Sequence, residues 1–195
     1  MQNSARTWLG SACLALALLA LNASAQPSQA TSSPAIPRVA PDEGRNDFDW
    51  EIGTWKTELR RLAKPLSGSK EWVEYTGTSI VRPVMDGRAN LVELRVEGPA
   101  GKIEGASLRL YNPQARQWSL HYASMRNGAL TRPVHGGFHD GRGEFYGEED
   151  LDGKAILVRF VISQLSADSA RFEQAYSEDG GRTWETNWIA VDTRS

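Results

Sequence analysis

Charged side chains occur in the middle of β-prone, apolar runs of this sequence. The clearest case is Arg159, which stands within the run ILVRFVI. Side chains alternate between the two faces of a strand, so this arginine faces either water or an interior. A buried charge is costly unless a counter-charge or ligand meets it. An inward Arg159 therefore needs Glu173, expected on the next strand, or an anionic ligand, whereas an outward Arg159 would form a surface cross-strand pair with Glu173.

Seven residues in such positions are candidates for binding a ligand inside the fold. They combine cations, a carboxylate, an imidazole, a phenol, an amide and an indole. This mixture suits a small molecule with an aromatic or acyl body and a polar or anionic head. The candidates are Arg109, His121, Tyr122, Arg159, Glu173, Asn187 and Trp188. Strand alternation alone leaves open which face lines the interior.

The same residue types support a second hypothesis, an enzyme that works without a cofactor. An isomerase, cyclase or lyase needs a cavity, a general acid–base pair and a group that stabilises developing charge. Glu173 or His121 would act as the base and Tyr122 as the proton donor. Arg109 or Arg159 would stabilise an enolate or carboxylate. This hypothesis requires these groups to converge in one cavity.

The last 25 residues predict a β-hairpin. Two β-prone runs, 172–177 and 183–191, flank Glu178-Asp179-Gly180-Gly181, and the glycines accept the positive φ of a tight turn. The segment also matches the Asp-box pattern Ser-x-Asp-x-Gly-x-Thr-Trp over residues 177–184, which resembles the repeated motif of sialidase propeller blades. A propeller needs several copies. One copy predicts a hairpin turn and is no evidence of glycosidase activity.

The upstream chain repeats this strand-and-turn pattern at short intervals. Turn residues such as Asn127-Gly128, Asp140-Gly141 and Asp152-Gly153 separate the strands. Short connections favour an up-and-down antiparallel meander, and closure of the sheet removes its exposed edges. We therefore predict an all-β, closed antiparallel barrel whose last strand pairs with the first. The ten expected strands cover residues 54–61, 71–82, 89–96, 103–111, 117–125, 130–138, 143–149, 155–163, 171–177 and 183–191.

The segment before the first strand predicts a short helical plug. Phe48, Ile52 and Trp55 have the spacing of one helical turn, and Gly53 allows the chain to change direction into the strand. The plug is expected over residues 48–53. Together with ten strands, it would leave a cavity, because about eight strands already enclose space for side chains or one small ligand.

The N-terminal residues predict export from the cytoplasm. Arg6, a short apolar run and Ala23-Ser24-Ala25 have the order of a secretory signal peptide over residues 1–25, too short for a transmembrane helix. Residues 26–45 are rich in proline and poor in large apolar side chains, which is typical of a disordered tether. Residues 46–195 then form the barrel domain. The expected location is the periplasm or the exterior, with no membrane association after cleavage.

Two segments resemble known barrel families. Gly53-x-Trp55 at the start of the first strand resembles the signature of lipocalins and their calycin relatives, and FDWEIGTW and FEQAYSEDGGRTWETNW are the most specific stretches. The chain is similar to an uncharacterised bacterial secreted family of lipocalin-like barrels, and distantly to nitrobindin and fatty-acid-binding proteins. The resemblance implies a ten-stranded barrel and no particular reaction.

The remaining signals argue against several classes of function. Nitrobindin-like proteins bind haem through a histidine near the C-terminal strands, whereas residues 184–194 contain none. An extended His135–His139 pair is too widely spaced for a metal, and Cys13 lies in the expected signal peptide. We therefore predict no metal and no cofactor.

The net charge of −2 argues against nucleic acid as a partner. The expected partner is therefore a small molecule. The oligomeric state does not follow from the sequence.

Overall fold

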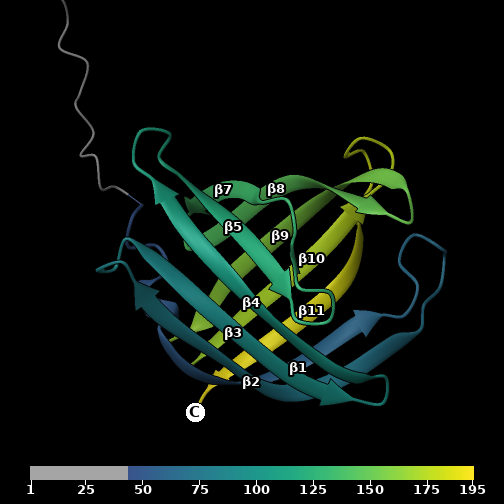
Figure 1. The fold of residues 1–195 in the computed structure, drawn as a ribbon, viewed down its shortest axis with the longest axis horizontal. Coiled ribbons are helices and arrows are strands. Elements are labelled where there is room, and N and C mark those ends of the chain that lie inside the picture. Colours follow the sequence, from purple (N-terminus) through teal and green to yellow (C-terminus); the bar gives the residue numbers. More distant parts are fainter. Residues whose placement is uncertain (1–43) are drawn as a thin grey trace, which may run out of the picture. The chain divides into compact units, whose positions relative to one another are not determined.

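Ten antiparallel strands close into a barrel in the computed structural model, and an eleventh, very short strand adds to one of them (Figure 1). The structure describes residues 44–195. The expected signal peptide and all but the last two residues of the expected tether lie outside this range. The strands are β1 (Gly53–Leu62), β2 (Trp72–Val84), β3 (Ala89–Gly98), β4 (Gly101–Asn112), β5 (Gln117–Ser124), β6 (Ala129–Leu130), β7 (Val134–His139), β8 (Arg142–Leu151), β9 (Lys154–Ser166), β10 (Ser169–Ser177) and β11 (Glu185–Arg194).

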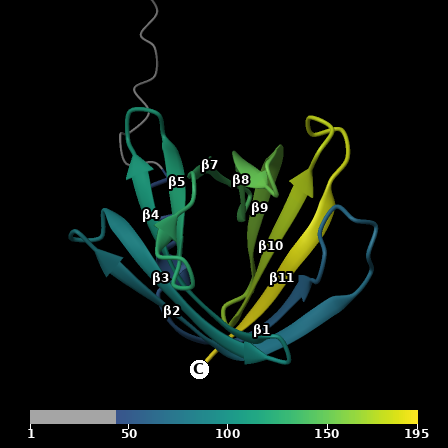
Figure 2. The same cartoon turned by 45° about the vertical axis from the view of Figure 1, so that its right-hand side comes forward.

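Closure of the barrel joins the two ends of the domain. β1 pairs antiparallel with β11 from Trp55 opposite Arg194 to Arg61 opposite Trp188. Every other neighbour in the barrel is next in sequence apart from β5 and β7, which the short β6 separates. Figures 1 and 2 show β1 and β11 side by side. The expected all-β meander with first and last strands paired is confirmed.

The strand expected over residues 130–138 is divided in the structure. β6 ends at Leu130 and β7 begins at Val134. Pro133 lies between them, and proline has no N–H to donate to a neighbouring strand. β5 therefore pairs with β6 near its end and with β7 over Trp118 to Leu120.

Helical structure among residues 44–195 is confined to one 3-10 turn, η1 (Asp49–Glu51), within the segment where a helical plug was expected. No helix in this range is long and apolar enough to cross a bilayer. The turn is held locally, because the Trp55 indole Nε1 donates to the Glu51 carbonyl oxygen at 2.7 Å.

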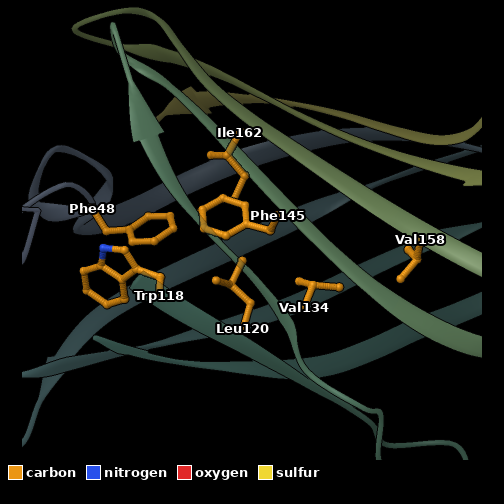
Figure 3. Packing of buried hydrophobic residues seen from close by; sticks show 7 residues of the cluster. All are labelled: Phe48, Trp118, Leu120, Val134, Phe145, Val158 and Ile162. Carbon is orange, nitrogen blue, oxygen red and sulfur yellow. The ribbon is translucent and has the colours of Figure 1, made fainter. Parts of the chain in front are cut away.

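An aromatic cluster closes one end of the barrel, which we call the floor. Phe48 packs edge-on against Trp118 with ring centroids 4.9 Å apart and stacks on Phe145 at 5.9 Å. Figure 3 shows these rings together with Leu120 and Ile162. All five side chains are buried. Residues before the first strand thus share a core with β5, β8 and β9.

The C-terminal end of β11 completes the floor. The Arg194 guanidinium lies 4.1 Å from the centroid of the Trp55 ring. It donates to the carbonyl oxygens of Trp50 at 2.8 Å and Ile52 at 3.1 Å. One arginine therefore satisfies two carbonyls of the entering chain and stacks on the buried tryptophan of β1.

The turn before β11 has the hydrogen bonds expected from its Asp-box pattern. The Asp179 carboxylate accepts from the Thr183 backbone N–H at 2.9 Å and its hydroxyl at 2.7 Å. Ser177 donates to the same carboxylate at 2.8 Å. These bonds hold the pKa of Asp179 down at about 2. The motif therefore stabilises the turn at the tip of the hairpin.

Replacement of Phe48 by alanine tests whether the residues before β1 belong to the core. Phe48→Ala removes a ring that is only 1% exposed, and buried Phe→Ala changes cost about 3–5 kcal/mol. We expect a loss of that size in the free energy of unfolding, measured by urea denaturation. The matched control Leu130→Ala, at a side chain 69% exposed, should change it by less than about 0.5 kcal/mol. Equal effects of the two substitutions would contradict this role.

Candidate functional site

A cavity of about 160 Å³ lies inside the barrel. Its middle, which we call the waist, is apolar. The Phe160 and Phe172 rings meet edge-on at 5.1 Å across neighbouring strands. The waist is lined by Val92, Leu94, Leu120, Phe160, Ile162 and Phe172. These side chains come from the four strands β3, β5, β9 and β10, so the cavity exists only when the sheet is closed.

Polar groups gather where the cavity meets the floor. Arg109 of β4 and Glu51 of η1 form a two-pronged ion pair, with the second contact, Nη2 to Oε1, at 3.2 Å. Their side chains are 7% and 13% exposed. The Arg109 guanidinium also lies 4.2 Å above the Phe48 ring. Its Nε is buried and has no hydrogen-bond partner among the described residues.

Asp192 of β11 is a second carboxylate at the same end of the cavity. Its Oδ1 accepts a hydrogen bond from the Thr57 hydroxyl at 2.5 Å, and Thr57 is 2.7 Å from the Ser79 hydroxyl. We call Glu51, Thr57, Ser79, Arg109 and Asp192 the floor cluster; all five line the cavity.

The pKa of Asp192 is raised to about 6. Burial is the largest cause and the nearby Glu51 charge adds to it, whereas the Thr57 and Ser79 hydroxyls and Arg109 oppose it. The site thus holds a carboxylate that changes protonation close to neutral pH, in contact with a cavity.

At the other end the cavity widens into a mouth of about 600 Å³. Arg61 at the end of β1 lies there with its guanidinium 6.0 Å from the centroid of the Trp188 ring. Among residues 44–195, no carboxylate forms an ion pair with Arg61. Lys102 and Arg126 line the mouth as further cations, against the carboxylates Glu104 and Glu149.

A β-bulge brings Asn187 to the mouth next to Trp188. The pairing of β10 with β11 shifts between Gln174 and Ala175, which leaves Asn187 unpaired in the register. A bulge redirects a side chain that alternation would send to the other face. Asn187 is 1% exposed and accepts from Gln174 Nε2 at 2.8 Å, while its own Nδ2 has no partner among the described residues.

Two tyrosines and a carboxylate form the wall between the waist and the mouth. Burial raises the pKa of Glu149, which accepts a hydrogen bond from the Tyr176 hydroxyl at 3.2 Å. Burial also raises the pKa of Tyr122, and the charge of Arg61 opposes this rise. Tyr122 lies across Gly105, where a β-carbon would collide with its hydroxyl. The absence of a side chain at position 105 therefore determines where Tyr122 lies.

Four of the seven residues expected from the sequence line the interior. Arg109 is part of the floor cluster, Tyr122 and Trp188 line both the cavity and the mouth, and Asn187 lines the mouth. These four come from the consecutive strands β4 and β5 and from β11, which is distant from them in sequence and lies in the same barrel.

The other three expected residues lie on the outer wall. His121 stands between two lumen-lining residues of β5 and contacts Ser119 at 3.1 Å. Arg159 stacks 4.8 Å from the Trp184 ring. Glu173 pairs with Arg171 at 2.9 Å, which lowers its pKa. The expected cross-strand partnership of Arg159 with Glu173 is replaced by these separate contacts.

The acid–base groups of the enzyme hypothesis therefore do not converge as the sequence suggested. Glu173 and His121 face away from the cavity that Tyr122 and Arg109 line. The interior carboxylates are Glu51, Asp192 and Glu149, which sequence reasoning did not select. For Asp192 a signal was available, because it continues the alternation Trp188, Ala190, Asp192 beyond the expected end of the strand.

The described residues contain no group of three or more histidine, cysteine, aspartate or glutamate side chains placed to hold a metal ion. His139 pairs with Asp140 at 3.2 Å, with both side chains highly exposed. The interior chemistry is thus carried by carboxylates, hydroxyls and arginines.

Substitution of Asp192 by asparagine tests the environment of the floor. Because its folded-state pKa is raised above the ordinary value of 3.8 to about 6, the folded state binds the proton more tightly. The contribution of Asp192 to the free energy of unfolding is therefore greatest below about pH 4 and is lost as the pH rises through 6. Asp192→Asn keeps an acceptor for Thr57 and removes the charge. We expect the free energy of unfolding of Asp192→Asn to exceed that of the parent by about 2–3 kcal/mol at pH 8 and to equal it at pH 4.

Urea denaturation at the two pH values measures this difference. Glu58→Gln, at an exposed carboxylate next to Thr57 on β1, is the control and should show no such pH dependence. A stability difference for Asp192→Asn that stays constant from pH 4 to pH 8 would contradict the raised pKa.

Comparison with solved structures finds similar barrels, while no family model and no curated protein matches the chain. The S-type phycobiliprotein lyase CPES from Guillardia theta has a TM-score of 0.52 at 14% identity, over 81% of this chain and 94% of the lyase. A de novo designed fluorescence-activating β-barrel has a TM-score of 0.43 at 14% identity, over 77% and 98%. The redesigned barrel mFAP0 bound to DFHBI has a TM-score of 0.42 at 12% identity, over 74% and 99%. The likeness to the lyase concerns the fold alone: this chain shares the architecture of a closed antiparallel β-barrel.

Proposed function

We propose that the barrel binds a small amphipathic molecule in its lumen and acts as a carrier or sensor. The observation that carries this proposal is the division of one continuous interior into an apolar waist and two polar ends. Ligand sites are typically apolar cavities with a few convergent polar groups. The cavity and the mouth share Tyr122, Glu149, Gln174 and Trp188 in their linings, so a molecule in the waist reaches both ends.

The anionic end of such a ligand belongs at the mouth. Arg61 has its guanidinium near the Trp188 ring and forms no ion pair with a described residue, and Asn187 has a spare buried donor. The floor is less suitable for an anion, because Arg109 is already paired with Glu51 and Asp192 adds a second carboxylate. An acyl or aryl acid would therefore place its body in the waist and its acid group under Arg61.

The proposed place of action is the periplasm or the exterior. The support is the signal-peptide pattern of residues 1–25 and the proline-rich stretch that follows. A carrier or sensor in that compartment would bind its ligand without needing a cofactor from the cytoplasm. The resemblance of residues 48–55 to secreted lipocalin-like barrels favours the same assignment.

Filling the waist should weaken the binding of a ligand in the lumen. Ala190 lines the cavity on β11, and Ala190→Phe places a ring inside it. We expect binding of the neutral probe N-phenyl-1-naphthylamine, measured by its fluorescence, to weaken at least about tenfold, or about 1.4 kcal/mol. Ala106→Phe is the matched control, since Ala106 lies on the outer wall between lumen residues Gly105 and Ser107. Equal binding by both variants and the parent would refute a luminal site.

The charge preference at the mouth is tested with two probes that differ by one sulfonate. Arg61→Gln should weaken binding of 8-anilinonaphthalene-1-sulfonate about three- to tenfold, the size expected for a partly exposed charge contact, and leave N-phenyl-1-naphthylamine unchanged. Arg60→Gln is the control, because Arg60 stacks on Trp72 at 5.1 Å one position away. If Arg61→Gln affects both probes equally, the mouth does not select for negative charge.

A further inference from the structure

The floor cluster holds more chemistry than ligand binding requires. It places an ionisable carboxylate, two hydroxyls and a fixed guanidinium around the inner end of one apolar cavity. We propose that the floor is a proton-transfer site, in which Asp192 removes a proton from carbon next to a carbonyl group and Arg109 stabilises the oxygen anion that forms. This inference rests on the proposed luminal binding, because a substrate must first occupy the waist.

Asp192 has the position of a general base. It lines the cavity, and Thr57 holds its carboxylate through a 2.5 Å hydrogen bond that is itself supported by Ser79. General bases work best when their pKa lies near the operating pH, and burial with the Glu51 charge raises that of Asp192 to about 6. At neutral pH the carboxylate is thus mostly ionised, yet more basic than an exposed aspartate.

Arg109 has the position of an electrostatic stabiliser. Glu51 fixes two of its nitrogens and Phe48 supports the face of the guanidinium, so the group is held in place before a substrate arrives. Its Nε–H has no hydrogen-bond partner among the described residues. Arg109 is only 6% exposed and lines the cavity. A preorganised donor in a site shielded from water is the arrangement that stabilises developing negative charge.

The reaction balances without an oxidant or a cofactor. The C–H electron pair becomes the C=C bond of an enolate, the carbonyl π pair moves to oxygen, and the proton goes to Asp192. When the substrate carries a C=C bond next to the acidic carbon, the enolate is conjugated with that bond, and return of the proton to the far end of the bond gives an isomer and regenerates the carboxylate. The substrate class is therefore a small, largely apolar β,γ-unsaturated ketone or aldehyde that places its carbonyl oxygen toward Arg109. This differs from the sequence hypothesis, which assigned the base to Glu173 or His121.

The probe 5-nitrobenzisoxazole tests for such a base directly. Removal of its ring C–H proton breaks the N–O bond and releases a coloured cyanophenolate, so the rate reports a carboxylate that reaches an apolar ligand. We expect the purified barrel to accelerate this reaction, with a rate that rises through about pH 6. Asp192→Asn should lower the rate at least about 100-fold. Glu58→Gln, with its exposed carboxylate on β1, should leave it unchanged.

Two further measurements separate chemistry from binding and folding. Thr57→Val removes a hydrogen bond that lowers the pKa of Asp192, so the inflection of the pH–rate profile should move to higher pH. Binding of N-phenyl-1-naphthylamine should persist in Asp192→Asn, which shows an intact lumen. If that probe binds the parent but 5-nitrobenzisoxazole reacts equally fast with parent and Asp192→Asn, the proton-transfer inference is wrong and the carrier proposal stands. If neither probe is bound or turned over, both fail.

A titration of the Asp192 carboxyl carbon by NMR supplies a readout that does not depend on turnover. A midpoint near 6 in the parent that moves upward in Thr57→Val is the expected result. A midpoint near 4 in both would overturn the assignment of Asp192 as the base even if Asp192→Asn were poorly folded.

Discussion

The ion pair between Glu51 and Arg109 is the contact on which the inner end of the barrel depends. Both side chains are largely removed from water, where a single unpaired charge would cost several kcal/mol. Glu51 belongs to the turn before β1 and Arg109 to β4, so the pair fastens the entering chain to the wall. It also positions Phe48, whose ring lies against the guanidinium and the aromatic core. The floor, and with it the depth of the cavity, follows from this contact.

The floor and the mouth differ in how their polar groups are paired. At the floor, carboxylates outnumber the arginine that faces them, and the excess shows as the raised pKa of Asp192. At the mouth, the cations Arg61, Lys102 and Arg126 outnumber the carboxylates Glu104 and Glu149, and Arg61 lies near an indole without an ion-pair partner among the described residues. The two ends of the interior therefore differ in their balance of charges, with carboxylates in excess at the floor and cations in excess at the mouth.

The outer wall shows how polar residues amid apolar strands are used when they face water. Arg159 stacks on Trp184, which Tyr146 also meets at 6.0 Å, and Glu173 pairs with Arg171. These contacts cover the hairpin that carries the Asp-box turn. They give structural roles to residues whose types alone suggested catalysis, because an exposed arginine and a lumen arginine have the same sequence signature.

The sequence by itself determined the architecture. Regular turn residues, β-prone runs and the absence of long helical patterns predicted a closed antiparallel meander, since local turn chemistry and hydrophobic alternation are properties of short segments. It also selected Arg109, Tyr122, Asn187 and Trp188 as interior groups.

Only the tertiary structure decided which face of each strand lines the lumen. That choice depends on register and bulges: His121 follows the alternation outward, whereas the bulge at Asn187 overrides it. Asp192 and Glu51 acquire their chemistry only when β1, β4 and β11 meet, because desolvation and neighbouring charge arise from residues far apart in the chain.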